Sequence, residues 1–197
     1  MQKYKVFLNS KFLLITNIEI ICNDCIKYTK ISDEIVNVFL NIDDYENIQI
    51  VCNNPEDVFN SLLKYFKYIE AAGGIVENIN NEILSIFRLN HWDLPKGKIE
   101  KGELPRQAAK REVAEECGIN IDEIGTELEP TYHIYERDNK LWLKKTFWYK
   151  MKYSGSEKLV PQTEEDITKV IWISKNDIGK YTDKMFSGIK EIIKVYL

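Results

Sequence analysis

GKIEKGELPRQAAKREVAEECGI (residues 97–119) is the stretch that decides how this chain is interpreted. Within it, Pro105 and Gly118 predict the two ends of a helix, because proline is favoured at the first helical position and glycine just after the last. One side of that helix carries small or apolar residues, which allow close approach to a sheet: Ala108, Ala109, Val113 and Cys117. The stretch therefore predicts a charged loop followed by a helix that packs on a sheet.

The other side of the predicted helix carries three glutamates, Glu112, Glu115 and Glu116. Residues three or four positions apart project from the same face of a helix, so the carboxylates are expected to lie close together. Like charges at this spacing cost a few tenths of a kcal/mol, and carboxylates near a helix C-terminus also oppose the helix dipole. The cluster is either an acidic face in contact with solvent or a site for a divalent cation such as Mg²⁺, which prefers oxygen ligands.

The loop before the helix favours the cation site. In WDLPKGKIEKGE (92–103), Gly97 and Gly102 bracket a charged segment, and glycines let a loop present its carbonyls and amides to a ligand. Lys96 and Lys98 would place positive charge near a phosphate group, although exposed lysines usually do no more than keep a protein soluble.

Taken together, these residues resemble the Nudix box, Gly-x5-Glu-x7-Arg-Glu-U-x-Glu-Glu-x-Gly-U, in which U is a bulky apolar residue. Every specified position from Gly97 to Ile119 matches. The segments AAGGIVEN before the box and EEDITKVIWIS after it are also similar to the family. The resemblance covers about residues 68–197, and it divides the chain into a small α+β N-terminal domain (1–67) and a Nudix hydrolase domain (68–197).

The resemblance implies an α/β fold, a Nudix α/β/α sandwich around a mixed sheet, preceded by the small α+β region. Nudix proteins typically hydrolyse a nucleoside diphosphate linked to another moiety, with Mg²⁺ or Mn²⁺ as cofactor. The loop WDLPKGKIEKGE is somewhat closer to members that act on dinucleoside polyphosphates. Nucleoside triphosphates, nucleotide sugars, ADP-ribose and capped RNA ends stay open as substrates.

The resemblance also implies roles for the residues of the box. Glu115 and Glu116 would be metal ligands, and Glu112 a ligand or the base that activates water. Glu103 would be an outer or additional metal contact, and Arg111 would orient the carboxylates. The backbone carbonyl immediately before the box glycine, that of Lys96, would be a further metal contact.

Other candidates lie outside the box. Many family members recruit an acid from a later loop, and PQTEED offers Glu164 and Glu165, although a solvent-facing loop explains these residues equally well. In the strand-like KLWLKKTFWYKMK, one face carries Trp142 and Lys144 with Thr146, Trp148 and Lys150, suited to stacking a base and binding phosphate, or to protecting an exposed edge strand. Arg88 is another candidate substrate contact. His91, Tyr132 and His133 are similar candidates, and a surface position or packing alone would explain all four residues.

The remaining pattern predicts alternating strands and helices. In the first part we expect strands at 4–9, 12–17 and 47–52 and helices beginning near Ser32 and Pro55, the second running to Ile69 because apolar residues recur at helical spacing. In the second part the pattern predicts five strands and a closing helix: 69–78, 82–89, 129–137, 140–153 and 168–174, then 183–196.

Composition sets broad limits. The 197 residues are 44% hydrophobic and carry a net charge of −4, which is typical of a globular protein and argues against bulk binding of nucleic acid. No apolar run approaches the ~20 residues that span a bilayer, so we expect a cytoplasmic protein without a membrane partner, with a homodimer as a possible assembly. Cys22 and Cys25 lack the further ligands of a zinc site and are expected, like Cys52 and Cys117, to be ordinary thiols.

Three functions are compatible with these residues. The first is a metal-dependent Nudix pyrophosphohydrolase acting on a small nucleotide or polyphosphate, which the intact acidic box favours. The second is a nucleotide-sensing or partner-binding module that keeps the fold without turnover. The third, an isomerase of the same fold, would need a cysteine in its pocket, and neither Cys52 nor Cys117 lies in a matching motif.

Overall fold

The computed structural model describes residues 2–22, 24–41 and 47–196, and the chain divides into two compact units. The first unit comprises Met1–Ile69 together with Tyr132–Lys144, and the second comprises Glu70–Thr131 together with Lys145–Leu197. The division after residue 69 lies close to the expected boundary at residue 67. The first unit, however, also takes in the end of a hairpin that is distant in sequence.

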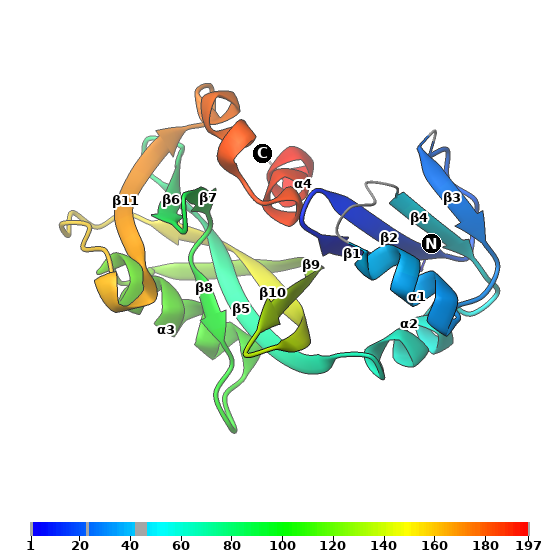
Figure 1. Cartoon of the computed structure of the whole chain (residues 1–197). Helices are drawn as coiled ribbons and strands as arrows, with labels where there is room; N and C mark the ends of the chain where they lie inside the picture. The colour runs from blue at the N-terminus through cyan, green and yellow to red at the C-terminus, as the bar shows by residue number, and fades with distance from the viewer. Residues whose placement is uncertain (1, 23, 42–46, 197) are drawn as a thin grey trace. The chain divides into compact units, whose positions relative to one another are not determined.

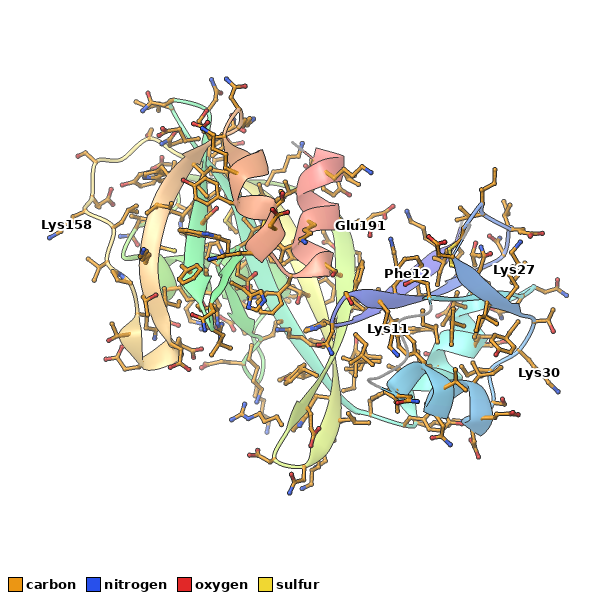
Figure 2. The ribbon with its side chains drawn as sticks, turned by 45° about the horizontal axis from the view of Figure 1, so that its top comes forward. Lys11, Phe12, Lys27, Lys30, Lys158 and Glu191 are labelled. Atoms are coloured by element: carbon orange, nitrogen blue, oxygen red, sulfur yellow. A yellow bond between two sulfur atoms is a disulfide. The ribbon has the colours of Figure 1, made fainter. Side chains whose placement is uncertain are left out.

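The first unit is a mixed sheet with two helices (Figure 1). β1 pairs antiparallel with β2, while β2 and β3 each pair parallel with β4, and β1 pairs parallel with residues 132–134 of β9. Its elements in chain order are β1 (Lys3–Leu8), β2 (Lys11–Thr16), β3 (Cys25–Tyr28), α1 (Asp33–Leu40), β4 (Asn47–Val51) and α2 (Pro55–Leu63). Figure 2 marks Lys11 and Phe12 at the start of β2 and Lys27 on β3.

Local sequence explains where the helices of this unit begin. Ser32 caps α1 by accepting the Ile35 N–H, and Asn54 caps α2 ahead of Pro55. The apolar faces of both helices pack with the strands in one core, which also contains Tyr132, Ile134 and Leu143 from the hairpin. The expected extension of α2 to Ile69 is wrong: α2 ends at Leu63, and Ile69 lies on β5, because strand pairing outweighs the helical spacing of those residues.

The second unit is an α/β/α sandwich, as the sequence predicts. Its strands follow the order β11-β6-β5-β10-β9, with β7 added to β6 and β8 added to β5. The elements are β5 (Lys67–Asn78), β6 (Glu82–Arg88), β7 (His91–Asp93), β8 (Lys96–Lys98), α3 (Pro105–Cys117), β9 (Glu123–Arg137), β10 (Lys140–Tyr153), η1 (Thr163–Glu165), β11 (Ile167–Ser174), η2 (Ile178–Lys184) and α4 (Ser187–Tyr196).

Each face of this sheet is covered by a helix (Figure 1). The apolar side of α3 packs on one set of strand residues, including Val76, Leu84 and Met151. α4 packs on the alternate set, in a core that includes Ile75 and Trp148. Since strand side chains alternate between faces, the two helices lie on opposite sides of the same strands.

Two expectations are corrected by the structure. Trp148 is fully buried in the α4 core, with its indole N–H donating to Thr131 at 2.9 Å, and Thr146 is also buried, so this face of β10 is not an open stacking surface. Cys22 and Cys25 are not free thiols; they are joined in a disulfide, with their Cα atoms 5.4 Å apart, within the range that a disulfide spans. Among the described residues, no helix has both the length and the apolar character needed to cross a bilayer.

Candidate active site

The helix α3 begins and ends where the sequence predicts. Pro105 occupies its first turn, and Gly118 follows it in the left-handed conformation with φ of 73°, donating its N–H to Ala114 at 2.9 Å. These ends fix the register of the helix, so that Arg111, Glu112 and Glu116 meet the loop that contains β8.

Arg111 is the centre of the acidic cluster. Its guanidinium forms a two-pronged ion pair with Glu103, both contacts measuring 2.9 Å, and it also donates to Glu112 at 2.7 Å and to Glu115 at 2.8 Å. A further N–H donates to the backbone carbonyl of Lys98 at 2.9 Å. Arg111 therefore forms ion pairs with three glutamates of the box, and it lowers the pKa of Glu103, while the three carboxylates raise its own pKa.

Glu116 is the most deeply buried acid of the cluster, with a side chain that is 1% exposed. One carboxylate oxygen, Oε2, accepts the backbone N–H of Lys96 at 2.8 Å. The other, Oε1, has no hydrogen-bond partner among the described residues and lies 3.7 Å from the guanidinium of Arg88. Burial raises the pKa of Glu116 to about 7, because a charged carboxylate is poorly solvated in this position.

Glu112 lies against the loop at Gly97. Its side chain is 12% exposed, and burial raises its pKa, with further increases from the neighbouring charges of Glu115 and Glu165. A Cβ atom on residue 97 would lie 1.9 Å from Oε2 of Glu112. Glycine at this position leaves room for the Glu112 carboxylate, which a side chain on residue 97 would displace.

The loop that supplies the Lys96 N–H is fixed by a buried pair that the sequence analysis missed. Asp93 and Lys96 are both buried, and the Lys96 ammonium donates to one oxygen of Asp93 while the N–H of Leu94 donates to the other at 2.8 Å. Lys96 also pairs with Gly73 of β5. The WDLPK spacing, with an acid and a lysine three residues apart, is the signal that could have indicated this contact.

The loop between β10 and β11 is attached to the C-terminal end of α3. The N–H of Val160 donates to Cys117 at 2.9 Å, and the N–H of Gln162 donates to the carbonyl of Glu116 at 3.3 Å. This attachment positions η1, where Glu165 lies 3.8 Å from Arg88. Glu164 and Glu165 are both exposed, and it is the contact with Arg88 that places Glu165 beside the cluster.

The other candidate residues lie elsewhere. The side chain of Lys98 is exposed at the end of β8. Trp142 and Lys144 belong to the first unit, where the ammonium of Lys67 lies 5.8 Å from the Trp142 ring and that of Lys144 lies 5.5 Å from Tyr135. Three further aromatic candidates have packing contacts: His91 with Phe186, Tyr132 with Phe59, and His133 with Tyr135.

The donor set fits a hard divalent cation in its chemistry. Glu112, Glu115 and Glu116 supply carboxylate oxygens, and Oε1 of Glu116 is a buried oxygen without a hydrogen-bond donor. Within the described ranges, no three acidic, histidine or cysteine side chains already converge in a metal-holding arrangement, and Glu112 and Glu115 are both paired with Arg111. A cation would have to share these carboxylates with Arg111.

Comparison with known proteins identifies relatives of the second unit. A family model for the NUDIX domain matches residues 67–195. The 8-oxo-dGTP diphosphatase of Escherichia coli (strain K12) is 36% identical over 95 residues, which is 45% of this chain and 70% of that enzyme. The RNA pyrophosphohydrolase of Roseobacter denitrificans is 37% identical over 76 residues, 34% of this chain and 48% of that enzyme.

The fold is also found in solved structures. The MutT protein from Methanosarcina mazei Go1 superposes with a TM-score of 0.52 at 20% sequence identity, covering 66% of this chain and 92% of that protein. At this level of identity the similarity shows the fold alone. The residues that match the family motif therefore carry the functional comparison.

Proposed function

The chain belongs to the Nudix hydrolase family, and we propose that it is a pyrophosphohydrolase that depends on Mg²⁺ or Mn²⁺ and cleaves a phosphoanhydride bond in a nucleoside diphosphate linked to another moiety. The observation that carries this proposal is the burial of Glu116 and Glu112 beside Glu115 on one face of α3. Burying carboxylates costs free energy unless a positive charge compensates them, and the two arginines leave Oε1 of Glu116 without a donor.

In this proposal Glu115 and Glu116 are the main metal ligands, and the Lys96 carbonyl is a further one. When bound, the cation would hold phosphate oxygens, lower the pKa of a water molecule and stabilise the charge that develops during an in-line displacement. Glu103 is already engaged by both nitrogens at one edge of the Arg111 guanidinium. Its role is therefore to position Arg111 and, through it, the other carboxylates.

Two residues are suited to accept the proton released from the attacking water. Glu112 is largely buried and its pKa is raised by burial, which makes it a stronger base than an exposed carboxylate. Glu165 is 53% exposed and lies near Arg88, from which it would approach the phosphate chain on the other side of Glu116. We assign Glu112 as a ligand or the base, and Glu165 as the additional acid.

The substrate contacts follow from charge. Arg88 lies between Glu116 and Glu165, where its guanidinium would also reach a phosphate oxygen. Lys98 is exposed at the end of the β8 strand and is free to turn toward a phosphate, whereas the ammonium of Lys96 is paired with Asp93. We propose dinucleoside polyphosphates as the first substrate class to assay, followed by nucleoside triphosphates and capped RNA ends.

The test is a panel of these compounds assayed for phosphate or nucleotide release with Mg²⁺ or Mn²⁺. Wild type is compared with Glu115→Gln and Glu116→Gln, and Glu123→Gln, an exposed glutamate on β9, serves as the matched control. We expect both site variants to lose at least about 100-fold in turnover while remaining folded, and the control to be unchanged. Undiminished turnover in the site variants would move the active site elsewhere, and tight binding without turnover in wild type would favour the sensing module.

A further inference from the structure

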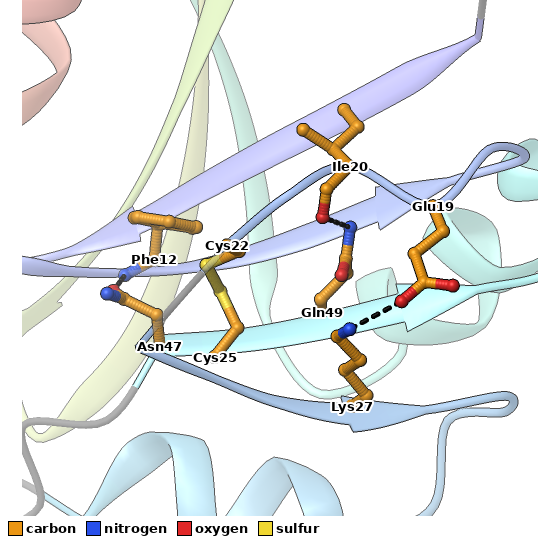
Figure 3. Close-up of a disulfide and its surroundings, with 8 residues drawn as sticks. All are labelled: Phe12, Glu19, Ile20, Cys22, Cys25, Lys27, Asn47 and Gln49. Atoms are coloured by element: carbon orange, nitrogen blue, oxygen red, sulfur yellow. Dashed lines mark hydrogen bonds and ion pairs between the residues drawn. A yellow bond between two sulfur atoms is a disulfide. The ribbon is translucent and has the colours of Figure 1, made fainter.

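The disulfide between Cys22 and Cys25 is a feature that the proposed hydrolysis does not use (Figure 3). It belongs to the first unit, whereas the acidic cluster belongs to the second. The disulfide joins Cys22, in the segment that follows β2, to Cys25, the first residue of β3. Strand β3 lies at the edge of the sheet and pairs with β4.

The crosslink closes a segment that also contacts β3 and β4 through side chains. Gln49 on β4 is fully buried, and its amide nitrogen donates to the backbone carbonyl of Ile20 at 3.2 Å. Glu19 forms an ion pair with Lys27 on β3. Figure 3 shows these contacts on the same side of the sheet as the disulfide. The segment from residue 17 to 22 is therefore attached to β3 and β4 by one covalent bond, one buried hydrogen bond and one exposed ion pair, and at its start Ile18 exchanges two hydrogen bonds with Thr16 of β2.

The disulfide-bonded cysteines and the two free cysteines differ in their surroundings. Cys22 and Cys25 are half-buried, and the neighbouring Ile21 is 91% exposed, so a reductant can approach the sulfur atoms. Cys117 is fully buried in the α3 core, and burial raises the pKa of its thiol. Cys52 is half-buried, burial raises its pKa too, and its Sγ lies 3.9 Å from the Thr16 carbonyl. The thiolate is the reactive form, so Cys52 and Cys117 are poor partners in exchange.

We propose that Cys22 and Cys25 form a reversible redox site that exchanges electrons with a dithiol reductant. A thiolate of the reductant attacks one sulfur, the bond between Cys22 and Cys25 breaks, and the departing sulfur takes up a proton. The second thiol of the reductant then displaces the remaining cysteine. The protein gains two electrons and two protons, and the reductant becomes a disulfide.

Reduction would loosen the edge of the first unit's sheet. Without the crosslink, the start of the segment keeps its hydrogen bonds between Ile18 and Thr16, while its contacts with β3 and β4 are reduced to the Gln49 hydrogen bond and the exposed Glu19–Lys27 pair, and exposed ion pairs contribute little. We therefore expect local opening of β3 to become more frequent in the reduced protein, without unfolding of the β1–β2–β4 core.

The first test counts thiols in the full-length native protein. The oxidised form should contain two free thiols, Cys52 and Cys117, and dithiothreitol should release two more, which react with a maleimide at least about tenfold faster than Cys117. Removal of dithiothreitol and addition of oxidised glutathione should restore the starting state. Four free thiols that no oxidised glutathione treatment converts to a disulfide, or a disulfide that dithiothreitol reduces only after denaturation, would overturn the proposal.

The second test measures amide hydrogen exchange at β3 in both redox states. Exchange at residues 25–28 should rise about tenfold on reduction, and a Cys22→Ser, Cys25→Ser double variant should match the reduced wild type under oxidising conditions. Strand β6 of the second unit is the internal control and should not change. Equal exchange rates at β3 in the two redox states would show that the disulfide does not stabilise β3 and would contradict the expected increase in local opening.

Discussion

Replacing Glu116 with glutamine should raise the stability of the metal-free protein and weaken its binding of metal. Glutamine has nearly the same shape, and its carbonyl oxygen can still accept the Lys96 N–H that now donates to Oε2 at 2.8 Å. The variant removes only the ionisable group. In the metal-free protein, that group is a carboxylate whose side chain is 1% exposed.

The size of the effect follows from the raised pKa. Burial raises the pKa of Glu116 from 4.5 to about 7. At about 1.4 kcal/mol per pH unit, the difference corresponds to about 3 kcal/mol as an upper bound. Below pH 4.5 the carboxyl is protonated in both folded and unfolded chains, so the variant and wild type should be equally stable. Between 4.5 and about 7 only the unfolded chain releases the proton, so wild-type stability falls as pH rises.

The assay is urea unfolding of chelator-treated protein at pH 4.5 and pH 8, followed by far-UV circular dichroism. At pH 8 the Glu116→Gln variant should be more stable than wild type by up to about 3 kcal/mol, and at pH 4.5 the two should agree to within about 0.5 kcal/mol. Saturating Mg²⁺ should stabilise wild type by at least about 1.4 kcal/mol more than the variant, which is the equivalent of a tenfold difference in affinity, since a ligand stabilises the state that binds it. A variant less stable than wild type at pH 8 without metal would refute the reasoning.

Three further substitutions test neighbouring contacts. Gly97→Ala should fold with a loss of about 1–2 kcal/mol in the free energy of unfolding, measured in urea. A methyl group on residue 97 would lie 1.9 Å from Oε2 of Glu112 and would push that carboxylate away. Calorimetry should therefore show Mn²⁺ binding weakened at least about tenfold. Arg111→Lys keeps one charge and loses the two-pronged contact with Glu103, so thermal unfolding should show a loss of about 1–3 kcal/mol, and equal stability would contradict that contact. Asp93→Asn leaves a buried ammonium unpaired and should destabilise by about 3–5 kcal/mol in urea, and adding a Lys96→Met substitution should recover part of that loss.

The parts of the site that depend on local sequence could be predicted. The ends of α3 follow from Pro105 and Gly118, and the helical spacing of Arg111 and the glutamates then places them on one face. The parts of the site that depend on contacts between residues distant in sequence could not be predicted. Glu165, rather than Glu164, meets Arg88 because the loop is hydrogen-bonded to the last turn of α3, and nothing in PQTEED distinguishes the two acids.

The sequence-based predictions of the fold that proved wrong also depend on contacts between residues distant in sequence. Alternation along β10 identifies two faces but cannot show that α4 covers the one carrying Trp148. The spacing of apolar residues after Pro55 is helical, yet the pairing of β5 ends α2 at Leu63. Residues 132–144 join the first unit through pairing with β1, across more than 120 positions of sequence. The oxidation of Cys22 and Cys25 depends on the distance between their Cα atoms, which the spacing alone leaves open.

The most direct test of the account is calorimetric titration of Mn²⁺ into chelator-treated protein at pH 8, for wild type, Glu116→Gln and the control Glu123→Gln. The account predicts saturable binding to wild type and to the control, and a loss of at least about tenfold in affinity for Glu116→Gln, because the buried carboxylate is a metal ligand. Affinity that is unchanged in Glu116→Gln, or no saturable binding to wild type at millimolar Mn²⁺, would contradict it.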